Sequence, residues 1–296
     1  MRKIQLALLA GGLALLSMGC APGGPDNTTV TAMQARATKV LDHWAAASAA
    51  SGGTPTVIVV GDLTGQVGDW EMPFGDNAKR ALMAGLVLSN TELNAANPST
   101  ATVTWSNGQA TTVPVLDAQD AIAAIGRGGG AGASCGDCSP LMAVSAELAT
   151  DPITTTLGPA RGPVWEFGIR GTAVKVTRVA IANAVVAQPM EDDPGGALAI
   201  DSASSTVGGT TVTVRFVGAP DPASQPCGED YTADAVESDL AVTVLVWRHP
   251  NVSLLPMGCT AVGAYRTVTA TLARPLGDRP VLDPASGQPV TLTLAP

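Results

Sequence analysis

Apolar and polar residues alternate along several stretches of this chain, and this alternation predicts β-strands. Val103 and Trp105 alternate with Thr102 and Thr104, an Asn107-Gly108 pair follows, and residues 111–115 form the returning strand. Asn-Gly between two alternating segments is a strong signal for a tight turn between paired strands. We therefore expect a β-hairpin over residues 100–115.

The last third of the chain contains more of these patterns. Residues 211–217, 267–272 and 290–294 alternate, which is typical of strands with one buried face. Residues 241–247 are apolar at almost every position, as expected for a central strand that is covered on both sides. Residues 283–287 carry Asp, Pro, Ser and Gly and predict a turn. These short strands separated by turns predict an antiparallel sandwich-like or barrel-like module.

The first two thirds of the chain predict both helices and strands. Residues 30–50 place apolar side chains at helical spacing and predict an amphipathic helix that covers a sheet. A second, shorter helical pattern ends near Gly126. Asp117 directly precedes this pattern and is in the position of an N-cap. Residues 56–60 predict a short strand. Two further strands are predicted over 141–148 and 164–169, with 151–163 as the connection between them.

Together these patterns predict a mainly β protein with a few short helices, of the α+β class. Residues 188–196 are rich in Pro, Gly and acids and are the best candidate for a boundary between domains. The predicted organisation is a signal peptide (1–19), a flexible tether (20–30), a β-rich N-terminal domain that begins with the helix (31–189) and an antiparallel β C-terminal domain (190–296).

The N-terminus predicts where the protein is located. Arg2 and Lys3 precede an apolar run from Leu6 to Leu16, and a small residue, Gly19, stands directly before Cys20. This pattern is that of a secretory signal. Its end resembles a bacterial lipobox, which implies that Cys20 is lipidated and becomes the new N-terminus. We expect a lipid-anchored protein on the extracytoplasmic face of the cell membrane; cleavage without lipidation is the alternative.

Composition excludes one class of partner. The net charge is −9, and only 14% of the residues are charged. An acidic chain lacks the basic surface that nucleic-acid binding requires, so no nucleic-acid partner is expected. The predicted partners are the membrane, through the lipid anchor, and an envelope protein.

The remaining four cysteines predict disulfides, because exported proteins meet oxidising conditions. We favour the pairs Cys135–Cys138 and Cys227–Cys259, although four cysteines allow three pairings. A redox role for the Cys-x-x-Cys motif, or metal binding by it, is an alternative. The motif follows a glycine-rich stretch and leads into a predicted strand, which favours a structural clip over the helix N-terminus that activates a redox cysteine.

Other candidate chemistry is sparse. His43 and His249 are the two histidines, and both are far from the cysteines in sequence. No nucleophile elbow, phosphate-binding loop or dinucleotide fingerprint is present. The acids at 62, 69, 71 and 76 and those at 191–193 do not match the spacing of a calcium loop. We therefore expect no cofactor, no metal and no catalytic residue.

Several short motifs resemble uncharacterised secreted lipoproteins of actinobacteria. They are the stretch 16–20, Gly68-Asp69-Trp70-Glu71 with Asn77-Ala78-Lys79, Trp165-Glu166-Phe167, and 267–269 through 274–283. The resemblance implies a cell-envelope location and no particular reaction. The expected function is a membrane-anchored, non-enzymatic binding module; the alternatives are an enzyme of unrecognised type, including Cys-x-x-Cys thiol–disulfide chemistry, and a solute-binding lipoprotein.

Overall fold

The predicted fold class is confirmed. The computed structural model describes residues 27–52, 56–71, 75–90, 92–93, 98–127, 135–185, 187, 189–190, 196–251 and 258–295. Within these ranges strands account for 43% and three helices accompany them, so the protein is mainly β and of the α+β class. The predicted signal peptide, Cys20 and residues 21–26 of the predicted tether lie outside the described residues.

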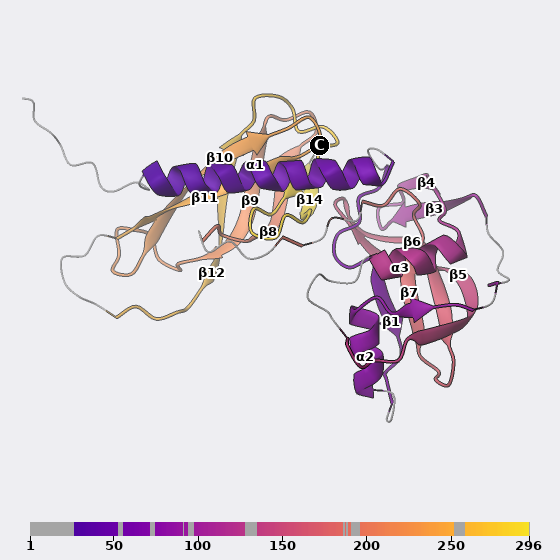
Figure 1. Ribbon diagram of the computed structural model, residues 1–296. Helices are drawn as coiled ribbons and strands as arrows, with labels where there is room; N and C mark the ends of the chain where they lie inside the picture. Colours follow the sequence, from indigo (N-terminus) through magenta and orange to yellow (C-terminus); the bar gives the residue numbers. More distant parts are fainter. Residues whose placement is uncertain are drawn as a thin grey trace, which may run out of the picture.

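One seven-stranded sheet forms the N-terminal lobe (Figure 1). Its strands are β1 (Thr64–Val67), β2 (Val87–Leu88), β3 (Thr100–Trp105), β4 (Ala110–Pro114), β5 (Leu141–Thr155), β6 (Gly158–Ile169) and β7 (Lys175–Val179). Their order is β1-β7-β6-β3-β4, and β5 pairs with β6 on one side and β2 on the other. Strands β3 and β4 pair antiparallel around the Asn-Gly turn, which confirms the predicted hairpin.

Helices α2 (Gly75–Met83) and α3 (Ala118–Arg127) cover one face of this sheet (Figure 1). Trp165 and Phe167, both fully buried, are at the centre of the core between helices and sheet. The side chain of Asp117 accepts a hydrogen bond from the backbone N–H of Gln119 at 2.8 Å, which confirms the predicted N-cap. A second core lies on the opposite face, around Val103 and Trp105.

Two local predictions in this lobe are wrong. Residues 151–163 are not a connection, because β5 and β6 pair along their whole length from Ala143↔Ile169 to Thr155↔Gly158. Residues 56–60 form no strand, only a single bridge between Val59 and Thr155.

Two sheets form a sandwich in the C-terminal lobe, which confirms the sandwich-like prediction. One contains β10 (Glu229–Glu237), β11 (Val242–Pro250) and β13 (Val281–Leu282); the other contains β12 (Ala264–Thr271), β9 (Thr211–Gly218), β8 (Ile200–Thr206) and β14 (Thr291–Ala295). Fully buried Val212, Val214 and Phe216 pack against Val242 and Val244 between the sheets. The sheets are not purely antiparallel, since β13 pairs parallel with β11 and β14 pairs parallel with β8.

Helix α1 (Asn27–Ala50) lies across the C-terminal lobe (Figure 1). It contacts β11 and β10, and its Met33 and Ala37 pack against Leu245 and Trp247. Strand β11 is therefore buried on both faces, as its sequence predicted, with the helix covering one face and the second sheet the other. The helix begins at Asn27, so the last four residues of the predicted tether are helical.

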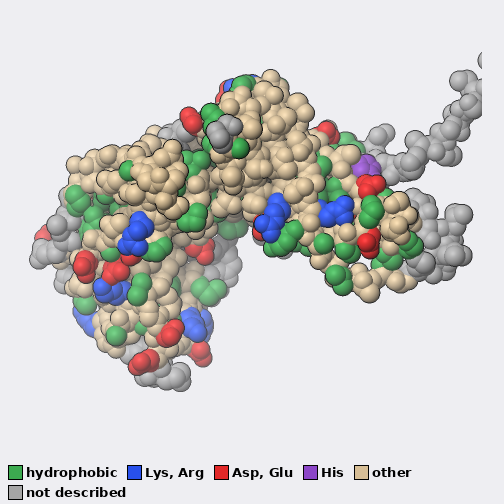
Figure 2. Space-filling model, turned by 180° about the vertical axis from the view of Figure 1, so that it is seen from behind, with side chains coloured by type: hydrophobic (Ala, Val, Ile, Leu, Met, Phe, Trp, Pro, Cys, Tyr) green, Lys and Arg blue, Asp and Glu red, His purple; other side chains and the backbone are tan. Residues whose placement is uncertain are grey.

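From Asn27 onward the chain therefore passes from the C-terminal lobe into the N-terminal lobe and then returns. The two lobes touch where the backbone N–H of Leu292 donates to the carbonyl of Thr156 at 2.5 Å. Ile58 packs with Trp44 of α1 in the same region. Seen from behind, a notch separates the lobes below this junction, and charged side chains of both signs are scattered over the surface (Figure 2).

Candidate functional site

The structure brings the four predicted cysteines together as Cys135–Cys138 and Cys227–Cys259, both at disulfide distance. The first pair lies in a turn just before β5. Ser139, next to it, exchanges two hydrogen bonds with Asn77 of α2, and Asp137 forms an ion pair with Arg80 of the same helix. The motif therefore fastens α2 to the start of β5.

The surroundings of the Cys-x-x-Cys motif do not favour redox chemistry. Helix α3 ends at Arg127, and in the described part of the chain no helix starts at Cys135. The N-terminal turn of a helix is what lowers the pKa of the attacking thiol in such motifs. Potential metal-ligand atoms of Cys135, Asp137 and Cys138 lie within 4.8 Å of one another, but sulfurs joined in a disulfide are not thiolate ligands.

The second disulfide joins the segment after β9 to the segment before β12, with 5.6 Å between its Cα atoms. Next to it, Glu229 accepts hydrogen bonds from Arg248 and from the hydroxyl of Tyr231 at 2.8 Å. The Arg248 guanidinium holds the pKa of Glu229 below its ordinary value, and burial raises the pKa of Tyr231. These groups satisfy one another, which marks them as supports for the loop.

The other residues considered from sequence do not converge. His249 shares a hydrogen bond of 2.8 Å with Thr232, while His43 lies on α1. Asp62, Asp69, Glu71 and Asp76 are all exposed. The acids at 191–193 lie outside the described residues. Within the described ranges, no histidine therefore joins a cysteine or carboxylate cluster of metal-binding size.

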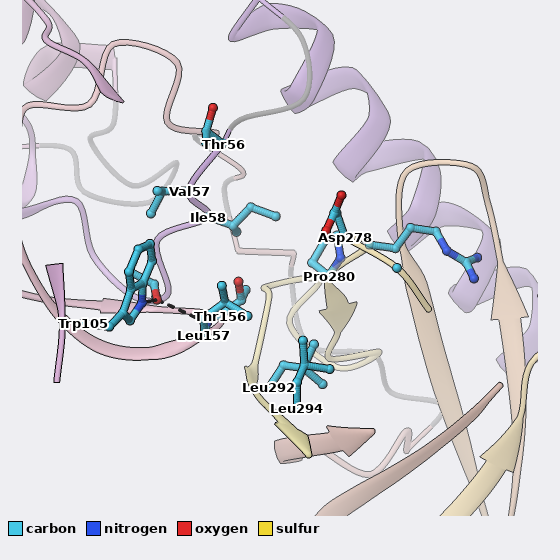
Figure 3. Close-up of a pocket in the computed structure, with 13 residues that line it drawn as sticks. Thr56, Val57, Ile58, Trp105, Thr156, Leu157, Asp278, Pro280, Leu292 and Leu294 are labelled. Carbon is cyan, nitrogen blue, oxygen red and sulfur yellow. Dashed lines mark hydrogen bonds between the residues drawn. The ribbon is translucent and has the colours of Figure 1, made fainter. Parts of the chain in front are cut away.

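Sequence reasoning missed a cavity of about 360 Å³ between the two lobes. Figure 3 shows Trp105, Val57, Ile58 and Leu157 of the N-terminal lobe facing Asp278, Pro280, Leu292 and Leu294 of the C-terminal lobe. No local sequence pattern could have identified it, because its two walls are more than a hundred residues apart in the chain. The sequence predicts Trp105 only as a strand residue of the hairpin, and its side chain is 9% exposed.

The cavity is lined mainly by apolar side chains, and two of the polar groups at its wall already have partners. The indole N–H of Trp105 donates to the hydroxyl of Thr155 at 3.0 Å (Figure 3). Arg279, also at its wall, forms an ion pair of 2.9 Å with Glu237. In contrast, Leu157 and Leu294 at the rim are 51% and 38% exposed. Such an arrangement suits burial of an apolar group and offers no paired nucleophile and base.

Comparison with protein-family models, curated proteins and solved structures finds no match for this chain. None of the helices in the described ranges is both long enough and apolar enough to cross a membrane. The motifs behind the resemblance to lipoproteins have structural roles where they are described: Asn77 joins α2 to Ser139, Trp165 fills the core, and buried Asp283 accepts from the backbone of Ile200 at 2.9 Å.

Proposed function

We propose that this protein is a lipid-anchored, extracytoplasmic binding module without catalytic activity, and that it holds an apolar side chain of an envelope protein in the cavity between its lobes. The cavity is the observation that carries the proposal. It lies at the lower end of the size range for ligand sites, which suits a single large side chain. The exposed leucines at its rim supply the apolar contact that surrounds such an anchor.

The position of α1 supports a partner close to the membrane. Cys20, the predicted lipidation site, is seven residues before the start of the helix at Asn27. Even a fully extended segment of this length spans at most about 25 Å. Because α1 packs directly on β10 and β11, an anchor at Cys20 would hold the C-terminal lobe next to the membrane.

A crosslinking experiment in cells tests this proposal. A photo-crosslinking residue at Leu294 is expected to capture one dominant envelope protein. The capture should be lost in Leu157→Asp, since a carboxylate at the rim opposes burial of an apolar group. Val207→Asp is the matched control, because Val207 is 71% exposed and is not among the residues that line the cavity. Equal capture by both aspartate variants would contradict the proposed site.

The anchor has its own control. Cys20→Ala is expected to release the protein from the membrane fraction and to weaken the crosslink, because the local concentration of partner falls. Membrane fractionation of the variant measures this directly. A Cys20→Ala protein that still sediments with membranes would contradict the lipid anchor. It would not contradict binding in the cavity, so the anchor and the binding site are tested separately.

A further inference from the structure

A second cavity of about 380 Å³ lies where the end of α1 meets the N-terminal lobe. Its walls are mostly small or apolar, and they include Ala47, Leu116, Ala124 and Ile181. Two cationic side chains also line it: Arg178 from β7 and Arg127 from the last turn of α3. Arg127 is exposed, but Arg178 is buried and requires an explanation, because buried charges in proteins are ordinarily paired.

Arg178 occupies a position where the strand would ordinarily place an apolar residue. Side chains two apart in a strand share a face, so Arg178 lies on the same face as Val176 and Ala180, which are both fully buried. Arg178 is itself only 4% exposed. One terminal nitrogen donates to the hydroxyl of Thr64 at 3.0 Å, but no group in the described part of the chain accepts from the buried Nε.

The electrostatics of the cavity favour an anion. Burial, together with the nearby charge of Arg127, lowers the pKa of Arg178 to about 10. The guanidinium still carries its charge at neutral pH, about three pH units below that value. Within the described residues, no carboxylate lies within ion-pair distance of either arginine. The C-terminal ends of α1 and α3 supply partial negative charge only.

We infer that this cavity binds a small amphiphilic carboxylate, with its head group on Arg178 and Arg127 and its alkyl chain along the wall formed by Ala47, Leu116, Ala124 and Ile181. Arginine is a common partner of carboxylates in proteins, and a terminal nitrogen of Arg178, not the enclosed Nε, is the donor that a head group in the cavity would meet. A phosphate would bring a third oxygen and more charge into a wall that is otherwise almost entirely apolar. The site is separate from the cavity between the lobes and does not rest on the function proposed for it.

Calorimetric titration of the full-length chain carrying Cys20→Ala, which avoids detergent, tests the inference with octanoate as the probe. We expect saturable binding that is at least tenfold tighter than that of acetate, which lacks the chain, or octanol, which lacks the charge. Arg178→Leu should weaken octanoate binding at least tenfold, because hydrogen bonds to charged groups are among the stronger ones. Arg170→Leu, at an exposed arginine of the same lobe, should bind as the parent does.

A second variant protects the test against misfolding. Arg127 is exposed, so Arg127→Gln is expected to fold normally and to weaken octanoate binding several-fold. No binding by the parent protein at millimolar octanoate would overturn the inference. So would unchanged binding in both Arg178→Leu and Arg127→Gln. Tighter binding of octyl phosphate or inorganic phosphate than of octanoate would overturn the assignment to carboxylates.

Discussion

Among the described residues each lobe buries one arginine, and the hydrogen-bond acceptors around the two differ greatly. Arg279 in the C-terminal lobe is 8% exposed, and its guanidinium donates to Glu237 and to the carbonyls of Leu276, Ser238, Arg274 and Pro275. Arg178 in the N-terminal lobe is 4% exposed and donates, among the described residues, to Thr64 alone. The number of acceptors around each guanidinium thus distinguishes Arg279, which stabilises the fold, from Arg178, which we infer binds a ligand.

The largest expected effect is that of removing Arg279. Arg279→Met would leave Glu237, whose side chain is 18% exposed, without its cationic partner and would release the turn at 274–278. Breaking a buried pair by removing one partner costs about 3 to 5 kcal/mol. Chemical denaturation followed by tryptophan fluorescence measures this loss of stability. Arg274→Met, at an arginine whose side chain is 48% exposed, is the control and should cost less than about 1 kcal/mol. Similar losses in the two variants would contradict the structural role of Arg279.

The disulfides extend the comparison between the lobes. Cys227 and Cys259 are 32 positions apart, whereas Cys135 and Cys138 are separated by three. In the chain-entropy model the stabilisation grows with the length of the closed loop, to about 3 to 4 kcal/mol for Cys227–Cys259 and less than about 2 kcal/mol for Cys135–Cys138. Double serine variants of each pair, unfolded by urea, should therefore differ in stability. A larger loss from the Cys-x-x-Cys pair would show that the short clip does more than close a loop.

Two carboxylates of the C-terminal lobe, Glu229 and Glu237, predict that the stability of the protein depends on pH. Hydrogen bonding by Arg248 lowers the pKa of Glu229; for Glu237, burial works in the opposite direction, but hydrogen bonds from Ala273 and Arg279 outweigh it and lower the pKa. The unfolded chain then binds more protons than the folded one between the folded and ordinary pKa values. This contribution is complete above the ordinary value of 4.5 and is lost as the pH falls through the folded values.

Urea midpoints measured between pH 3 and 6 test this expectation. The midpoint should fall on acidification, and the fall should be smaller in a Glu229→Gln/Glu237→Gln double variant, which has lost both carboxylates. Asp62→Asn/Asp69→Asn, at exposed acids of the N-terminal lobe, is the matched control and should follow the parent. If the double Gln variant shows the same pH dependence as the parent, Glu229 and Glu237 are not its cause.

Sequence patterns predicted the local features well. The Asn-Gly hairpin, the Asp117 cap and the doubly covered strand β11 depend on neighbouring residues or on one strand's own alternation, and all three are present. The resemblance to lipoproteins supplied the expectation for Cys20, which stays a prediction because it lies outside the described residues.

Long-range features could not be predicted in this way. Nothing in residues 27–50 indicates that the helix covers β11, two hundred residues later, and the parallel pairing of β14 with β8 also depends on distant segments. Arg178 did leave a local signal, since an arginine in register with Val174 and Val176 interrupts an apolar face. Its meaning depends on the missing acceptors around it, which only the folded structure reveals.

Arg178→Leu, measured without ligand, is expected to have the smallest effect on stability. It is also the most direct test of the difference between Arg178 and Arg279. The leucine removes a buried charge that has few acceptors and keeps an apolar side chain against Val176. Replacing poorly compensated buried charge by apolar groups is often neutral or stabilising, so we expect a change between zero and a gain of about 1 kcal/mol in unfolding free energy. Denaturation beside Arg279→Met measures the difference. If Arg178→Leu loses stability as Arg279→Met does, both arginines are structural, and the contrast between the lobes disappears.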